Sequence, residues 1–166
     1  MAELQLAELY ANEIKAEQSA TRKCLERIPV SLFEYKPHEK SMALGYLALL
    51  VAEIPNWIAY IMNQGEIDFA TFKHFQPKST EELVNHFDEN MKAALKSLNG
   101  VANDAFNGTF ALKNQGQLLF QSSKKDNVSS SINHWVHHRG QLTVYMRLND
   151  IPVPSIYGPS ADERTF

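Results

Sequence analysis

Histidines are the residues of this sequence with the clearest capacity for chemistry, and three of the six fall within five positions of one another. His134 and His138 are four residues apart, which places both imidazoles on one face of a helix, about one turn apart. This spacing allows two ligands on one helix to reach a single metal ion. It also fits two polar side chains that are satisfied at an interface between helices, since two histidines supply only half of a four-coordinate shell. The spacing alone leaves both interpretations open.

Two further polar residues continue the helix face of His134 and His138. Gln141 and Tyr145 follow at helical steps, so we expect them to line a pocket beside the histidines. His137 is rotated by roughly 100° from His138 at 3.6 residues per turn, which places it outside that pocket. The candidate site is therefore a single helix face.

Other residues are weaker candidates for function. Cys24 lies on an apolar helix stripe, where a free cysteine is usually an inert part of the core. We expect Arg139 to be solvated or ion-paired, and Gly140 to allow close helix packing. The aromatic segment 72–75 either packs against the end of a helix bundle or caps a pocket.

Four helical segments must position these residues. Apolar residues recur every three or four positions in the first and third segments, whereas the second is apolar nearly all round, which is typical of a buried helix. Ser79 and Glu82 form a capping box at the start of the third. A long crossover, 101–126, precedes the fourth, and within it 110–112 and 118–120 suit a short hairpin. The predicted helices are 3–28, 41–63, 79–98 and 128–149. We therefore predict an all-α protein, an antiparallel four-helix bundle with a long crossover between helices three and four.

Length and composition exclude several classes of protein. The 166 residues suit one domain over 1–166, and 44% hydrophobic residues suffice for one core. A net charge of −3 lacks the basic excess of a nucleic-acid binder. The segment 42–62 is long enough to span a membrane, but Glu53, Pro55 and Asn56 at its middle favour a buried helix. Because no secretory signal is visible, we expect a cytoplasmic protein.

The segment from Asn133 to Gln141, NHWVHHRGQ, resembles the N-H-x-x-x-H-R-G-Q motif of the DinB-like superfamily. That superfamily includes YfiT-like metalloenzymes and thiol-dependent S-transferases. The resemblance implies a four-helix bundle, commonly a homodimer, with a divalent metal held by one histidine of the second helix and two of the fourth. It assigns His134 and His138 as the fourth-helix ligands. The similarity continues through 144–148 and 154–163, and 47–57 is similar to the family's first ligand helix.

The sequence departs from the family pattern at the first ligand. The family histidine should fall at position 50, which is Leu50, between Tyr46 and Glu53. Glu53 is the nearby oxygen donor that could substitute, although family helices carry a Glu there as well, and a three-residue shift moves the donor by about 4.5 Å along the axis. We expect His134 and His138 to face Leu50, with Tyr46 and Glu53 on neighbouring turns. Zinc or nickel should then bind weakly or not at all.

Two kinds of function follow, and whether the chain is an enzyme stays open. In the first, it is a metal-dependent thiol S-transferase or hydrolase, in which the metal polarises a thiol or water and Gln141 or Tyr145 contacts a small-molecule or thiol substrate. In the second, it is a non-catalytic bundle that binds a small ligand or serves as a structural dimer. Leu50 favours the non-catalytic bundle, whereas the retained histidines favour the metal-dependent enzyme. The apolar second helix also predicts a two-fold homodimer, with the second or fourth helix at the interface.

Overall fold

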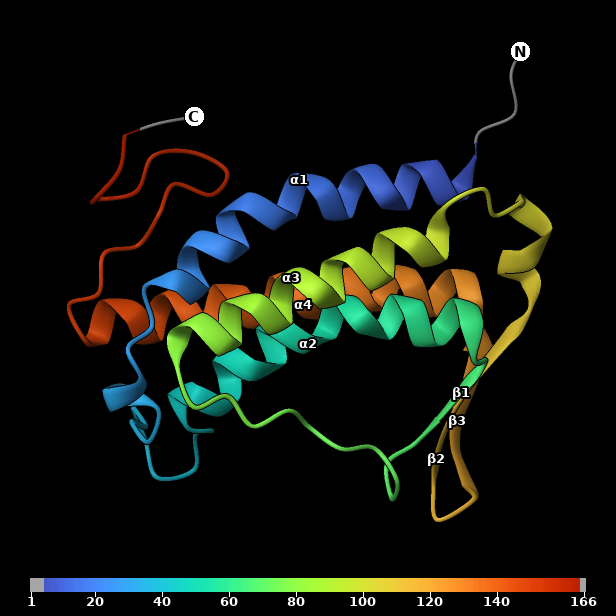
Figure 1. The fold of residues 1–166 in the computed structure, drawn as a ribbon, viewed down its shortest axis with the longest axis horizontal. Helices are drawn as coiled ribbons and strands as arrows, with labels where there is room; N and C mark the ends of the chain where they lie inside the picture. Colours follow the sequence, from blue (N-terminus) through green and yellow to red (C-terminus); the bar gives the residue numbers. More distant parts are fainter. Residues whose placement is uncertain (1–4, 165–166) are drawn as a thin grey trace.

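Four long helices form most of the protein. A computed structural model describes residues 5–164. The helices lie side by side along the long dimension of the molecule, and α2 packs mainly against α3 and α4 (Figure 1). Two short 3-10 turns, η1 (Val30–Leu32) and η2 (Asn103–Asn107), lie in the connections. The helices are α1 (Leu6–Glu26), α2 (Leu44–Asn63), α3 (Thr80–Leu98) and α4 (Lys124–Leu148).

The protein also contains a small mixed β-sheet, so the prediction of an all-α fold is wrong. Its strands are β1 (Glu66–Asp68), β2 (Thr109–Asn114) and β3 (Gln117–Ser123), in the order β1-β2-β3. Strand β1 runs parallel to β2, and β3 runs antiparallel to β2. The sequence indicated the β2–β3 hairpin but not β1. The long crossover between α3 and α4 is therefore largely a β-hairpin that extends from one end of the helices (Figure 1).

Hydrogen bonds between residues far apart in the sequence hold β1 beside the β2–β3 hairpin. The carboxylate of Asp68 accepts hydrogen bonds from the backbone N–H groups of Ala70, Gln115 and Gly116, which fixes the end of β1 beside the hairpin turn. Gln115 and Gly116 both have positive φ, 52° and 77°, as a tight turn requires. A strand of three residues is too short for the alternation of apolar and polar residues to be recognised in the sequence.

The helix ends follow local capping chemistry. Ser79 accepts a hydrogen bond from the Glu82 N–H at 3.0 Å, which confirms the capping box at the start of α3. Helix α4 begins four residues earlier than predicted, because Ser123 caps it by accepting from the Asp126 N–H at 3.1 Å. The predicted start of the first helix, at position 3, lies outside the described residues.

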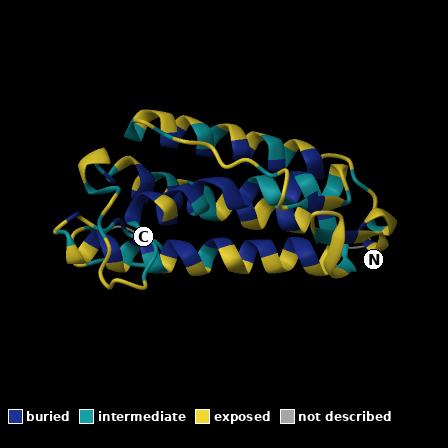
Figure 2. Cartoon of the chain, turned by 90° about the horizontal axis from the view of Figure 1, so that it is seen from below, coloured by how far each residue is buried: buried dark blue, intermediate teal, exposed yellow. Residues whose placement is uncertain are grey.

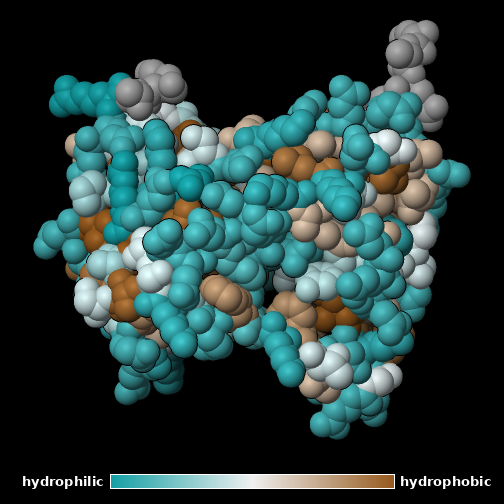
Figure 3. Space-filling view, in the orientation of Figure 1, coloured by the Kyte–Doolittle hydropathy of each residue, from teal (hydrophilic) through white to brown (hydrophobic). Residues whose placement is uncertain are grey.

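Helix α2 is the centre of the hydrophobic core. It is buried on nearly all sides, whereas the other helices bury one stripe each (Figure 2). By length and composition alone α2 could also cross a membrane, and 67% of its most apolar window is buried inside the protein. The face shown in Figure 3 is mostly hydrophilic, with apolar side chains in separate patches. Burial within the chain accounts for the apolar character of α2 without a partner subunit.

Candidate functional site

Helix α4 brings His134 and His138, which the sequence spacing placed on one helix face, into direct contact. Their Nε2 atoms are 2.8 Å apart, and their ring centroids are 4.5 Å apart. His138 is buried, whereas His134 is exposed toward a neighbouring groove. Gln141, one turn further along, has its Oε1 2.7 Å from Nδ1 of His138. Three of the predicted site residues therefore form one chain of hydrogen bonds.

These hydrogen bonds determine which ring nitrogens of His134 and His138 carry a proton. An amide oxygen only accepts, so His138 donates from Nδ1 to Gln141 and keeps a lone pair on Nε2. His134 must then donate from its own Nε2. Partial burial of the imidazole, which leaves His134 open to the groove, and next the neighbouring His138 and His137, lower the pKa of His134 below its ordinary value of 6.5. The Nε2 lone pair of His138 therefore accepts the Nε2 proton of His134, and that proton must move to Nδ1 of His134 before both Nε2 atoms can bind one ion.

The pair fits part of a metal site. A tetrahedral zinc ion with Zn–N distances of about 2.05 Å separates two nitrogens by about 3.3 Å, so the pair would have to open by about 0.5 Å. Gln141 holds the outer nitrogen of His138, which is the usual way to orient a metal-binding imidazole. Leu50 is half-buried against the core and offers no donor atom. Within residues 5–164, no three His, Cys, Asp or Glu side chains are grouped to hold a metal ion. The histidines alone supply half of a tetrahedral shell.

A groove of about 310 Å³ lies beside His134 between α2, α4 and the sheet. Its walls are mainly aromatic and aliphatic, with the hydroxyls of Ser130 and Ser131 on the α4 side. The β-sheet, of which only the β2–β3 hairpin was predicted, thus supplies part of the wall. The lining residues are Trp57, Ile61, Phe69, Phe110, Leu112, Phe120, Asn127, Ser130, Ser131 and His134.

Glu53 lies in a different environment from the paired histidines. Its carboxylate accepts hydrogen bonds from Nδ1 of His74 at 2.6 Å, the Phe75 N–H at 2.9 Å and Nε2 of His86 at 3.4 Å. Burial by itself raises the pKa of Glu53, but the hydrogen bonds from His86, His74 and Phe75 outweigh it and lower the pKa below its ordinary value. Both carboxylate oxygens are thus engaged by α3 and by the segment after β1.

His74 and His86 were not predicted as partners of Glu53. The available signal was Glu53 itself, because a carboxylate in the middle of a buried helix needs hydrogen-bond partners. Tyr46, predicted to line the pocket, is 45% exposed, and its ring lies 5.9 Å from that of His74. The segment 72–75 lines a cavity, the second of its two predicted roles.

The remaining candidates have structural roles. The Tyr145 hydroxyl donates to the Met42 carbonyl at 3.1 Å, which fastens α4 to the segment before α2. Burial raises the pKa of the Cys24 thiol to about 11, although Arg139 and Arg27 act in the opposite direction, so it stays protonated. A Cβ on Gly140 would meet no atom within 4 Å in the described part of the chain, so the close-packing prediction is wrong.

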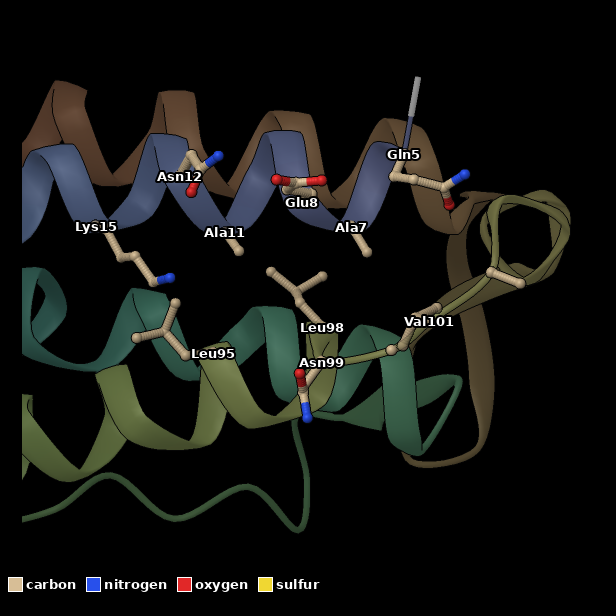
Figure 4. Close-up of a pocket in the computed structure, with 12 residues that line it drawn as sticks. Gln5, Ala7, Glu8, Ala11, Asn12, Lys15, Leu95, Leu98, Asn99 and Val101 are labelled. Atoms are coloured by element: carbon tan, nitrogen blue, oxygen red, sulfur yellow. The ribbon is translucent and has the colours of Figure 1, made fainter. Parts of the chain in front are cut away.

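A larger groove of about 560 Å³ lies between α1 and the C-terminal end of α3 (Figure 4). Its charged side chains are Glu8 and Lys15, and the rest of its lining is small, apolar or amide. No imidazole or thiol is among the described residues that line this groove, so its chemistry differs from that of the groove beside His134.

Comparisons with known proteins agree with this architecture. The chain resembles three solved structures of DinB-like proteins, each under 25% identical, which supports the fold alone. YjoA from Bacillus subtilis is 16% identical with a TM-score of 0.69, and the match covers 95% of this chain and 99% of YjoA. A protein from Bacillus cereus ATCC 10987 is 21% identical with a TM-score of 0.69, and the match covers 90% of this chain and 97% of that one. A protein from Exiguobacterium sibiricum 255-15 is 15% identical with a TM-score of 0.65, and the match covers 92% of this chain and 97% of that one. A 32-residue segment is 56% identical to the uncharacterised protein YrdA of Bacillus subtilis (strain 168), and it spans only 19% of each chain. The DinB family model matches residues 1–165, and the chain therefore belongs to the DinB family.

Proposed function

We propose that His134, His138 and the adjacent groove form the functional site of a metal-dependent thiol S-transferase or hydrolase that binds zinc or nickel with low affinity. The observation that carries this proposal is the contact between the two imidazole Nε2 atoms, 2.8 Å apart. To share an ion, these two nitrogens on one helix need to separate by only about 0.5 Å, and His134 must move its Nε2 proton to Nδ1. A bound divalent ion would polarise a coordinated thiol or water and lower its pKa.

The residues around the pair have distinct roles in this proposal. Gln141 fixes the tautomer and orientation of His138. The lowered pKa of His134 keeps that ring unprotonated near neutral pH, as a ligand requires. The groove accommodates the apolar part of a small substrate between Trp57 and Phe120, next to the His134 ring.

Leu50 supports a second function. With leucine at the position of the expected third histidine, the pair and groove also suit a protein that binds a small ligand without catalysis. In that case the hydrogen bond from His134 satisfies the buried Nε2 of His138 without an ion, as a buried polar group requires. The two functions differ in whether activity depends on metal.

Metal titration tests the first function. Calorimetry with zinc or nickel should give one site per chain, and Gln141→Leu should lower its affinity about tenfold. His134→Ala and His138→Ala should lower it further. The matched control is His137→Ala, because His137 packs against His138 at a ring distance of 5.2 Å but takes no part in the hydrogen-bond chain. Binding that survives both alanine variants would place the metal elsewhere.

Activity separates the two functions. Thiol consumption in the presence of an electrophile, and hydrolysis of a small ester, are measured with and without added zinc or nickel. A metal-stimulated rate that His134→Ala and His138→Ala both lack supports the enzyme. Ligand binding unaffected by a chelator, without any such rate, supports the non-catalytic protein.

A further inference from the structure

A second cavity, of about 230 Å³, surrounds Glu53 and contains groups that the proposed function does not use. It lies between α2, α3 and the segment that follows β1. Its lining includes Glu53, Tyr60, Phe72, His74, Phe75 and His86. The cavity therefore combines a buried carboxylate, two imidazoles and aromatic walls.

The charge on Glu53 is not available to a ligand. One carboxylate oxygen accepts from the Phe75 N–H and His86, and the other accepts from His74. A cationic ligand would have to displace these bonds, and an anionic ligand would approach a buried negative charge. Lys73 also lines the cavity, but it is exposed, so its charge stays hydrated while that of Glu53 is buried. The cavity is therefore best suited to a neutral ligand.

His74 provides the acceptor for such a ligand. Because its Nδ1 donates to Glu53 at 2.6 Å, the neutral ring carries its lone pair on Nε2. In residues 5–164 no group donates a hydrogen bond to that Nε2, and the side chain is 37% exposed. A carboxylate on the far nitrogen fixes the ring and strengthens the opposite nitrogen as an acceptor.

The walls suit a flat aromatic ring. Phe72 meets His74 edge to face at a centroid distance of 5.0 Å, and Phe75 stacks on His86 at 4.3 Å. Tyr60 meets Phe72 edge to face at 5.9 Å. Aromatic rings favour such offset and edge contacts with a further ring. An apolar cavity of roughly 150 Å³ is large enough to bind benzene, so this one has room for a single substituted ring.

We propose that this cavity binds a small, neutral phenol, with its ring among Tyr60, Phe72 and Phe75 and its hydroxyl donating to Nε2 of His74. A phenol combines one strong donor with one flat apolar ring, which matches one oriented acceptor among aromatic walls. An aliphatic alcohol donates to the same nitrogen but lacks the ring contacts. The site is independent of the His134–His138 pair.

The test compares phenol with anisole, in which a methyl group replaces the hydroxyl proton. Binding to the full-length protein is followed by calorimetry and by the NMR shifts of the histidine rings. Phenol should bind one site per chain about tenfold more tightly than anisole, the effect of one hydrogen bond made to a preformed acceptor. Equal binding of the two compounds would overturn the proposal.

Two variants test whether His74 causes the preference for phenol over anisole. His74→Phe keeps a ring in the wall but removes the acceptor, so it should bind phenol and anisole equally. Continued binding of anisole shows that the cavity of this variant is intact. His134→Ala is the control and should keep the wild-type preference for phenol, whatever its effect on metal. A preference that survives His74→Phe, or that His134→Ala abolishes, would place the phenol elsewhere and contradict the proposal.

Discussion

Arg139 of α4 and Glu17 of α1 form an ion pair between the two helices, with the guanidinium Nη2 2.5 Å from the carboxylate Oε2. Arg139 is only 2% exposed. Its guanidinium also donates to the Thr21 hydroxyl at 3.1 Å and to the Tyr157 hydroxyl at 2.8 Å. One buried side chain therefore ties α4 to α1 and to the C-terminal segment.

Replacing Arg139 should destabilise the protein strongly. Arg139→Met removes the cationic partner of the Glu17 carboxylate, whose side chain is only 14% exposed, and leaves it the Tyr157 hydroxyl as a neutral donor. Breaking a buried ion pair costs about 3–5 kcal/mol. Arg147 provides a matched control, because it pairs with Asp162 at 2.5 Å but is 49% exposed. Arg147→Met should cost less than about 1 kcal/mol. Urea denaturation measures both, and equal losses would contradict the buried role of Arg139.

Two helical glycines should respond oppositely to alanine. A Cβ on Gly45 would lie 2.7 Å from Cβ and Cγ of Phe33, so Gly45→Ala should cost about 1–3 kcal/mol. A Cβ on Gly140 would meet nothing within 4 Å in the described residues, so Gly140→Ala should stabilise the protein by up to about 1 kcal/mol. Thermal denaturation measures both. A destabilising Gly140→Ala would mean that this helix face packs against another molecule.

Stability should fall in acid partly through Glu53. Because the pKa of Glu53 is lower in the folded than in the unfolded chain, its contribution is complete above the ordinary pKa of 4.5 and is lost as pH falls through the lowered value. Glu53→Gln should cost about 1.5–3 kcal/mol at pH 7, because it removes hydrogen bonds to a charged group. Urea denaturation between pH 7 and pH 3 should show a smaller acid loss for the variant than for the wild type.

The control for this experiment is a surface carboxylate. Glu89 pairs with Lys92 on the surface of α3, where both side chains are about 70% exposed. Glu89→Gln should change stability by less than about 1 kcal/mol and leave the pH dependence as in the wild type. If Glu53→Gln has the same pH dependence as the wild type, its hydrogen bonds do not carry the acid sensitivity.

Sequence patterns predicted which residues share one helix face and where α3 is capped, but not which hydrogen bonds the histidines make. The His134–His138 contact, the bond from His138 to Gln141 and the Ser79 cap all join residues three or four positions apart. Helical periodicity fixes such pairs wherever the helix packs.

Features that join distant segments were not predictable in the same way. Strand β1 pairs with a strand more than forty positions away, and Glu53 reaches His74 and His86, 21 and 33 positions away. Tyr145 shares the helical spacing of the histidines but bonds to Met42 across the fold. Periodicity gives the face on which such a residue lies, and tertiary packing decides what it meets there.

A homodimer stays a prediction, and the exposed apolar residues of α4 make it testable. Val144 is 57% and Leu148 56% exposed, one turn apart on one face of α4. We expect light scattering to give twice the chain mass of 18.8 kDa. Val144→Lys with Leu148→Lys should give the monomer mass with unchanged circular dichroism, because lysine at an apolar interface must be desolvated. A monomeric wild type at micromolar concentration would contradict the prediction.

Restoring a histidine at position 50 should convert the weak metal site into a strong one. Leu50→His adds a third imidazole from α2, the helix that packs against α4. If it reaches His134 and His138, the affinity for zinc or nickel should rise by orders of magnitude. Because the ion binds only the folded state, free zinc at 100 times its dissociation constant should stabilise the variant by about 2.7 kcal/mol. Thermal denaturation with and without zinc measures this gain.

Two controls separate metal binding from the cost of a polar residue at a half-buried position. Without metal, Leu50→His should lose about 0.5–3 kcal/mol. Leu50→Asn carries a similar cost but lacks an imidazole, so zinc should not restore its stability. Leu50→His combined with His138→Ala should also lose the gain, because two ligands remain instead of three. A Leu50→His variant that zinc does not stabilise would show that position 50 does not face the histidine pair, and that this chain differs from the family pattern in the geometry of α2 as well as in one residue.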